Sequence, residues 1–149
     1  MTLRLPTRGM VLPARATASH TRWSWLLGTV GGPFQAGNLC MSQAQRDAVI
    51  GHTWNAGRAP PHVTLTVEFD EPVRLLRLCP HMNPESGHVG LVITVLGGSA
   101  ERVPHRALWR ENEWVSIALP GAASAFRIEF MESPSWIALH AVEGEPEEG

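Results

Sequence analysis

Apolar and polar residues alternate strictly along residues 62–69, which makes this segment the clearest strand of the chain. Its four apolar side chains fall on one face of an extended backbone, and Thr64, Thr66 and Glu68 fall on the other. The same alternation returns in residues 125–131. A period of two buries one face of a sheet and leaves the other in water, as in half-exposed antiparallel strands. The pattern predicts a protein built from such strands.

Glycine, proline and acidic residues divide the rest of the chain into further short segments. The predicted strands are residues 10–15, 62–69, 73–79, 89–96, 103–109, 113–119, 125–131 and 135–142. Asp70-Glu71-Pro72 is expected to be a tight hairpin turn, and Pro120-Gly121 to end another strand. Residues 23–30 form a further apolar segment that ends at Gly31-Gly32-Pro33. Frequent turns with little helix are typical of an all-β sandwich or barrel.

One short helix is predicted after residue 41. Ser42-Gln43-Ala44-Gln45 resembles a capping box, and Gly51 is a suitable end for the helix. The 149 residues fit a single domain, which we place at residues 10–143. Residues 1–9 are expected to be a flexible N-terminus, and the acidic residues 144–149 a disordered tail.

Composition and charge exclude several classes of protein. The net charge is −2 and 44% of the residues are hydrophobic, so the chain is neither disordered nor a basic module for polyanions. All 12 basic residues are arginine, and Arg102, Arg106 and Arg110 recur every four residues beside Trp109. Neighbouring glutamates dilute this positive charge, so nucleic-acid binding is not favoured.

The chain lacks the signals of a membrane or secreted protein. It contains no run of about 18 apolar residues, so no membrane span is predicted. The N-terminal sequence MTLRLPTRGMVLPARA has two prolines and scattered arginines, unlike a secretory signal. Cys40 and Cys79 are expected to be separate thiols, with a disulfide between them as the alternative. These features favour a cytoplasmic location.

The order of several motifs resembles a known family. Thr53-Trp54 precedes the alternating strand, and Phe126-Arg-Ile-Glu-Phe precedes Ser135-Trp-Ile-Ala-Leu-His-Ala-Val-Glu. Over residues 16–143 this order resembles the galactose-binding-like jelly rolls, in particular the discoidin (coagulation-factor type C) domains and the Doc domain of the anaphase-promoting complex. The resemblance implies an all-β jelly-roll sandwich of about eight mainly antiparallel strands with one short helix. It also implies a module that binds glycans, phospholipids or proteins through loops at one end.

By this resemblance, four loops are candidates for ligand contact: residues 19–36, 51–61, 80–88 and 104–112. The residues expected to bind the ligand are His81, Asn83, Glu85, His88, Trp109, Arg110, Trp54 and Arg58. The loop 80–88 has the densest set of donors and acceptors, which could hold sugar hydroxyls or a peptide. Its alternative role is that of a solvated loop whose histidines cover the sheet.

The tryptophans are assigned different roles. Trp109 lies where a strand gives way to a turn, and it is the preferred exposed aromatic residue. Trp54 could stack on a sugar ring through its indole face. Packing at the rim of the core, as in discoidin-type domains, is the favoured role of Trp54. Trp114 and Trp136 fall within predicted strands and are assigned to packing.

No cofactor is expected, although two metals have candidate ligands. Cys79, His81 and His88 are zinc-ligand types, but their spacing does not match that of a closed tetrahedral site. Many discoidin-type relatives hold a structural calcium ion, and by that resemblance Asn38, Asp47 and Thr53 are the candidate ligands here. His140 stands near the place where those relatives have a glutamate, so the calcium site departs from the family pattern.

The sequence predicts binding and not catalysis. It contains no nucleophile elbow, no phosphate-binding loop and no paired zinc motif of known enzymes. The leading hypothesis is a non-catalytic carbohydrate-binding module, and the alternative is an adaptor for a protein or peptide. A glycan site should show an exposed indole beside polar groups in a pocket. A protein site should show a broader patch with several apolar anchors.

Overall fold

A computed structural model describes residues 9–21, 35–40, 53–97 and 101–146 of the chain. The described elements are β1 (Arg15–Ala18), the 3-10 helix η1 (Ala36–Cys40), β2 (Trp54–Asn55), β3 (Val63–Pro80), β4 (Ser86–Val95), β5 (Arg102–Arg110), β6 (Val115–Glu132) and β7 (Ala138–Pro146). All the strand pairs among these elements are antiparallel. The all-β prediction is therefore confirmed.

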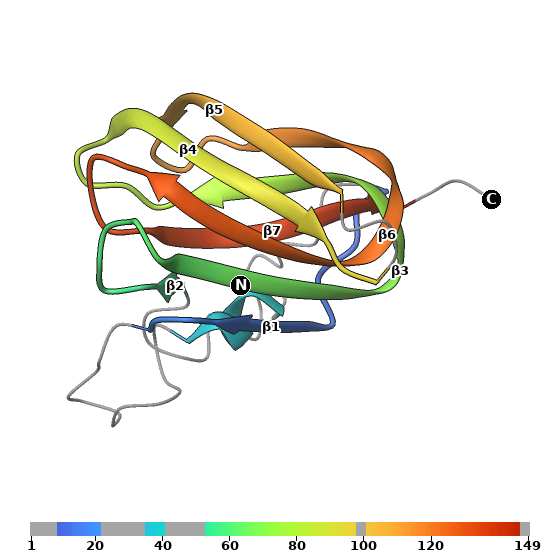
Figure 1. The fold of residues 1–149 in the computed structure, drawn as a ribbon. Helices are drawn as coiled ribbons and strands as arrows, with labels where there is room; N and C mark the ends of the chain where they lie inside the picture. The colour runs from blue at the N-terminus through green and yellow to red at the C-terminus, as the bar shows by residue number, and fades with distance from the viewer. Residues whose placement is uncertain (1–8, 22–34, 41–52, 98–100, 147–149) are drawn as a thin grey trace.

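The strands form two packed layers because β3 and β6 each take part in both (Figure 1). The first part of β3, residues 63–68, pairs with β1 and with residues 125–130 of β6. That part of β6 pairs with β4, which pairs with β5. The second part of β3, residues 73–80, pairs with β7 and, up to Leu78, with residues 115–123 of β6. β2 pairs with the outer side of β7.

Two predicted turns are wrong, because both lie inside continuous strands. Asp70-Glu71-Pro72 falls within β3, and Pro120-Gly121 falls within β6. The register between the two strands shifts between Glu68 and Val73, where the chain bends from one layer to the other. Proline has no N–H to donate to a ladder, and it is tolerated at such an irregularity. The turn residues therefore mark a bend in the strand and not a reversal of the chain.

The core lies between the two layers, and the predicted alternation places it correctly. The apolar residues of residues 63–69 are buried, as are Phe126, Ile128 and Phe130. Phe130 lies at the centre of an aromatic group, with its ring 6.0 Å from that of Trp54 and 6.5 Å from that of Trp109. The ring planes of Phe130 and Trp109 are perpendicular, which is a favourable arrangement for aromatic pairs.

The last strand continues further than predicted. β7 runs to Pro146, so residues 144–146 are part of the sheet and not of a disordered tail. Gly144 and Val11 exchange two main-chain hydrogen bonds of 2.8 Å, which tie this end of β7 to the N-terminal segment. The predicted strand at residues 10–15 is displaced, since β1 begins at Arg15. The predicted helix at residues 42–51 and the apolar segment 23–30 lie outside the described residues.

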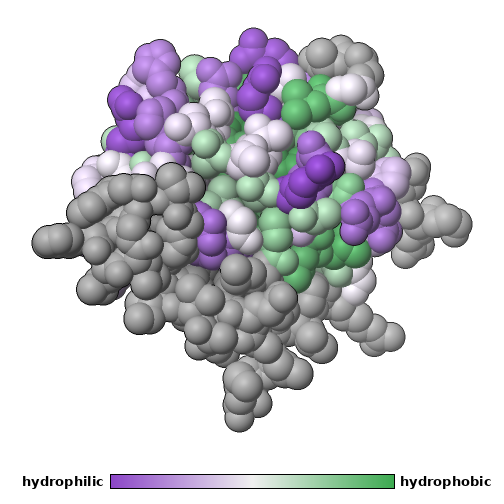
Figure 2. All heavy atoms as spheres, turned by 90° about the horizontal axis from the view of Figure 1, so that it is seen from below, coloured by the Kyte–Doolittle hydropathy of each residue, from purple (hydrophilic) through white to green (hydrophobic). Residues whose placement is uncertain are grey.

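The surface is mixed in character. On the face seen in Figure 2, described hydrophobic residues reach the solvent between clusters of hydrophilic ones. Exposed ion pairs join different strands: Arg15 of β1 with Glu68 of β3, and Arg106 of β5 with Glu132 of β6 across β4, each with an N–O distance of 2.7 Å. Within the described ranges, no helix has the length and apolar character that a membrane crossing requires.

The close approach of Gly144 to the core provides a test of this packing. A Cβ at Gly144 would lie 2.7 Å from Val73 Cγ1 and 2.9 Å from Phe69 Cε1, both in buried side chains. We expect Gly144→Ala to lower the free energy of unfolding in urea by about 1–3 kcal/mol, the usual cost of overpacking. The matched control is Gly121→Ala, because a Cβ there has no neighbour within 4 Å. Equal stability of the two variants would contradict the described packing.

Candidate functional site

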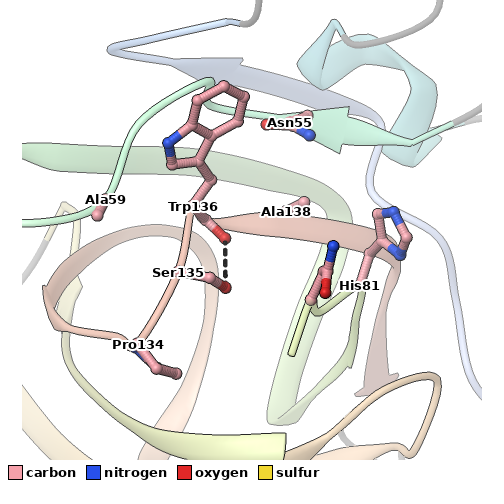
Figure 3. Close-up of a pocket in the computed structure, with 8 residues that line it drawn as sticks. Asn55, Ala59, His81, Pro134, Ser135, Trp136 and Ala138 are labelled. Carbon is pink, nitrogen blue, oxygen red and sulfur yellow. Dashed lines mark hydrogen bonds between the residues drawn. The ribbon is translucent and has the colours of Figure 1, made fainter. Parts of the chain in front are cut away.

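A pocket of about 580 Å³ is lined by three separate segments. These segments lie side by side at the left end of the sandwich in Figure 1. β2 and the loop that follows it supply one wall, the β3–β4 loop supplies a second, and the segment leading into β7 supplies a third (Figure 3). The lining residues are Asn55, Ala59, His81, Asn83, Pro134, Ser135, Trp136 and Ala138. This volume lies within the usual range for small-molecule sites.

The indole of Trp136 is the largest exposed side chain of the pocket, with 50% of its surface accessible. The backbone around it is fixed by the neighbouring loop: the Ala56 amide donates to the Ile137 carbonyl over 2.8 Å, and the Ile137 amide donates to the Arg58 carbonyl over 3.2 Å. The Ser135 hydroxyl donates to the Trp136 carbonyl over 3.4 Å (Figure 3). The indole is therefore presented to solvent from a backbone tied to the sheet.

A glycine on β4 supports the same wall. The Pro134 ring packs directly over Gly87, so closely that a Cβ at Gly87 would overlap the proline Cγ. The absence of a side chain at Gly87 thus allows the segment carrying Ser135 and Trp136 to approach the sheet.

The polar side chains of the pocket are amides, a hydroxyl and one imidazole. Asn55 is nearly buried, and its side-chain oxygen accepts from the Gly57 amide over 2.8 Å, which fixes the orientation of the amide group. His81 and Asn83 come from the exposed loop after β3. Among the lining residues that the structure describes, His81 is the one titratable side chain.

Behind this edge of the pocket, His81 belongs to a second group of side chains. Its Nδ1 lies 2.9 Å from Glu111 Oε2, and His140 Nε2 lies 3.2 Å from Glu111 Oε1. The Met82 amide also donates to Glu111 Oε1 over 3.0 Å. Partial burial acts to raise the pKa of Glu111. The hydrogen bonds from His81 and Met82, with the charges of both histidines, outweigh that effect and lower the pKa below its usual value.

Two of the residues predicted to bind a ligand line the pocket together, namely His81 and Asn83. Glu85, His88 and Arg110 are exposed but are not among the lining residues. Arg58 is also exposed. Its guanidinium lies 3.1 Å from His20 Nε2, and its carbonyl helps to hold the Trp136 segment. The ligand-binding role of these residues remains a prediction.

The expected roles of two tryptophans, Trp109 and Trp136, need correction. Trp109 was expected to be exposed, yet it is 3% accessible, because its ring packs edge-on against Phe130. Trp54 is fully buried, so it follows its predicted packing role and is not accessible to a sugar. Its indole N–H donates to the His20 carbonyl over 3.1 Å. Trp136 was assigned to packing within a strand, but it lies in the segment before β7, which begins at Ala138. Pro134 and Ser135 are residues typical of turns, and they could have indicated that Trp136 lies outside a strand.

The fold also bears on the candidate metal ligands. Cys40 and Cys79, both among the described residues, are not joined by a disulfide. The Cys79 thiol is buried and donates to Asn112 Oδ1 over 3.2 Å, so Cys79 does not join His81 and His88 in a zinc site. Among the described residues, the group of potential ligands that converge is His81, Glu111 and His140.

The calcium prediction is only partly within the described residues. The Asn38 side-chain amide donates to the Thr53 carbonyl over 3.0 Å, so these two candidate ligands are neighbours. Asp47 lies outside the described ranges. The calcium site therefore stays a prediction.

Comparison with known proteins bears on the fold. Neither a protein-family model nor a curated protein matches the sequence. Solved structures match over almost the whole chain. A CBM32 module from Clostridium perfringens, in complex with GalNAc-β-1,3-galactose, is 13% identical with a TM-score of 0.60, covering 95% of this chain and 98% of that chain. This chain has the same fold as that module. The family 32 carbohydrate-binding module of C. perfringens NanJ, in complex with galactose, is 14% identical with a TM-score of 0.58, covering 92% and 93%.

A third similar structure is the CBM32 module of AlyQ in complex with 4,5-unsaturated mannuronic acid. It is 15% identical with a TM-score of 0.57, and the match covers 91% of this chain and 96% of that chain. The shared fold confirms the mainly antiparallel β-sandwich predicted from the sequence.

The contact between Gly87 and Pro134 generates a prediction about the pocket wall. Because the proline ring is rigid, we expect Gly87→Ala to displace the segment that carries Trp136 while leaving the buried Trp54 in place. The ¹H–¹⁵N spectrum reports this as a shifted indole resonance of Trp136, which is assigned by its loss in Trp136→Phe. An unchanged Trp136 resonance in Gly87→Ala would contradict the described wall, and Gly121→Ala serves as the control.

The environment of Trp109 predicts a dependence of stability on pH. Its indole N–H donates to His105 Nε2 over 3.4 Å, and burial lowers the pKa of His105 below its usual value of 6.5. The folded state therefore favours the neutral imidazole. The contribution of His105 to the free energy of unfolding is fully present above the pKa that His105 has in the unfolded chain. It is lost as the pH falls through the lower pKa of His105 in the folded state.

We expect the free energy of unfolding in urea to fall between about pH 7 and pH 5, and His105→Gln to lose part of that dependence. His88→Gln, at an exposed position on β4, is the matched control and should retain the dependence. If His105→Gln showed the same pH profile as the wild type, the assignment of this effect to His105 would be wrong.

Proposed function

We propose that this protein is a non-catalytic carbohydrate-binding module that holds a sugar in the pocket beside Trp136. The observation that carries the proposal is the half-exposed indole of Trp136 next to the amides of Asn55 and Asn83 and the imidazole of His81. An exposed indole beside polar groups in a pocket is the arrangement expected of a glycan site.

The chemistry of the wall suits a pyranose ring. An indole presents a flat apolar face, which packs on the C–H face of a sugar and excludes water from it. Amides, hydroxyls and an imidazole offer hydrogen-bond donors and acceptors, as sugar hydroxyls do. One aromatic platform with a few fixed polar groups can therefore hold the ring and select its orientation.

The charge of the pocket favours a neutral sugar. Within the described part of the chain, no arginine, aspartate or glutamate is among the lining residues. A carboxylate or sulfate on the ligand would gain no bidentate partner there. Two of the three similar structures described above are complexes with neutral sugars, which supports this ligand class.

The same features argue against the other function classes. Besides Trp136, the large apolar side chains exposed in the described residues are Leu108 and Met131, and neither lines the pocket. A protein interface would place several apolar anchors around one centre. General acid and base catalysis by two residues would need a second titratable group facing the substrate beside His81.

A glycan array followed by calorimetry tests the proposal. We expect the wild type to bind one or more neutral glycans and Trp136→Ala to weaken that binding at least about tenfold, because about 1.4 kcal/mol of stacking is lost. Trp136→Phe should retain part of the affinity. The matched control is Leu108→Ala, which removes an apolar side chain of similar exposure (47%) away from the pocket.

Two outcomes would overturn the proposed function. One is an array on which the folded wild type binds no glycan at millimolar sensitivity. The other is a Trp136→Ala variant that binds the same glycan with unchanged affinity.

A further inference from the structure

His81, Glu111 and His140 converge although they are distant in the sequence. His81 follows the end of β3, Glu111 lies in the turn between β5 and β6, and His140 is the third residue of β7. Their potential ligand atoms all lie within 4.8 Å of one another. The imidazole rings of the two histidines have centroids 4.6 Å apart, and one nitrogen of each ring lies within 3.4 Å of both carboxylate oxygens.

The spacing of these atoms matches the requirements of a metal ion. The carboxylate oxygens lie 2.9–3.4 Å from His81 Nδ1 and His140 Nε2. Ligands bound at about 2.0–2.2 Å in tetrahedral or octahedral geometry are separated by roughly 3–3.5 Å from their neighbours. All the ligand atoms lie within 4.8 Å of one another, so binding of one ion requires the exposed His81 ring to turn until the two nitrogens reach that separation.

We propose that His81, Glu111 and His140 form a binding site for a divalent transition metal ion of the Zn²⁺ class. Two imidazoles and one carboxylate are typical ligands of zinc and of the first-row transition metals. Calcium and magnesium prefer sets of oxygen ligands, which this group does not offer. The site leaves coordination positions for water or a bound molecule.

The main chain holds together the segments that carry the three ligands before any metal binds. The Glu111 amide donates to the Glu85 carbonyl over 2.7 Å, and the Asn112 amide donates to the Pro80 carbonyl over 2.8 Å. These bonds tie the β5–β6 turn to the β3–β4 loop. The His81 amide donates to the Ala138 carbonyl over 3.0 Å, which holds that loop to the start of β7.

An ion can reach the site, because the side chains of His81, Glu111 and His140 are 44%, 31% and 27% exposed. His81 also lines the pocket, so a bound ion would fix one wall of that pocket. The metal proposal does not rest on sugar binding, since His140 and Glu111 are not lining residues.

Metal titration of the full chain without an affinity tag tests the proposal. We expect isothermal calorimetry to show one Zn²⁺ ion per chain, and Co²⁺ to give the visible absorption of a bound ion. Ca²⁺ should give no comparable heat. Glu111→Gln and His140→Ala should each weaken Zn²⁺ binding by more than about 100-fold, since the loss of a ligand exceeds the 10–100-fold effect of an outer-shell change.

Four variants serve as controls for this titration. His88→Ala and Cys40→Ser remove potential ligands elsewhere, and both should bind Zn²⁺ like the wild type. Trp136→Ala should also retain the metal, so that a failure of the sugar proposal is distinguished from a failure of this one. Gly121→Ala checks that a substitution alone does not alter the titration.

Two results would overturn the proposal: a wild type with no Zn²⁺ binding above buffer, or Zn²⁺ binding that Glu111→Gln and His140→Ala leave unchanged. The first result would mean that the group is held by hydrogen bonds alone. If both variants fail to fold, NMR of the wild type with Co²⁺ decides. The proposal then requires paramagnetic shifts of the His81 and His140 imidazoles, and shifts confined to other residues would contradict it.

Discussion

The antiparallel pairing of β3 with β6 holds the two layers of the sandwich together. Both strands are 18 residues long, and both cross from one layer to the other at a bend where their register shifts. The first part of β3 lies in one layer with the second part of β6, and the second part of β3 lies in the other layer with the first part of β6. This single pairing therefore sets the position of both sheets. The buried faces of the two strands also supply much of the core, including Leu65, Phe126 and Phe130.

The site is a consequence of this arrangement. β3 ends at Pro80 and β6 ends at Glu132, and the segments that follow carry His81, Asn83 and Trp136. The β3–β4 loop is hydrogen-bonded to the β5–β6 turn and to the start of β7, so the pocket wall and the histidine–glutamate group share one support. Rigid strands thus present a small set of loop residues, which is how binding sites are commonly built on β-sandwiches.

Much of the fold could be predicted from local pattern, and the site less so. The alternation in residues 63–69 and 125–131 identified the buried faces, because a period of two is a local property of an extended chain. The bends at Pro72 and Pro120 were misread as turns. Proline, glycine and acidic residues occur both at chain reversals and at bends within a strand. Only the strand that pairs with the segment distinguishes the two cases. Trp109 was expected to be exposed and Trp136 to be packed, and the structure has the reverse. The exposure of each indole depends on what the fold places against it, which is Phe130 for Trp109 and solvent for Trp136. The meeting of Glu111 with two histidines is a tertiary contact that no sequence spacing reveals.

The most direct test of the sugar-binding account is a crystal structure of the protein with a neutral glycan found to bind it. The account predicts a pyranose ring stacked on the indole of Trp136, with its hydroxyls hydrogen-bonded to Asn55, His81 or Asn83. A sugar bound at another surface, with the Trp136 pocket left to solvent, would contradict it.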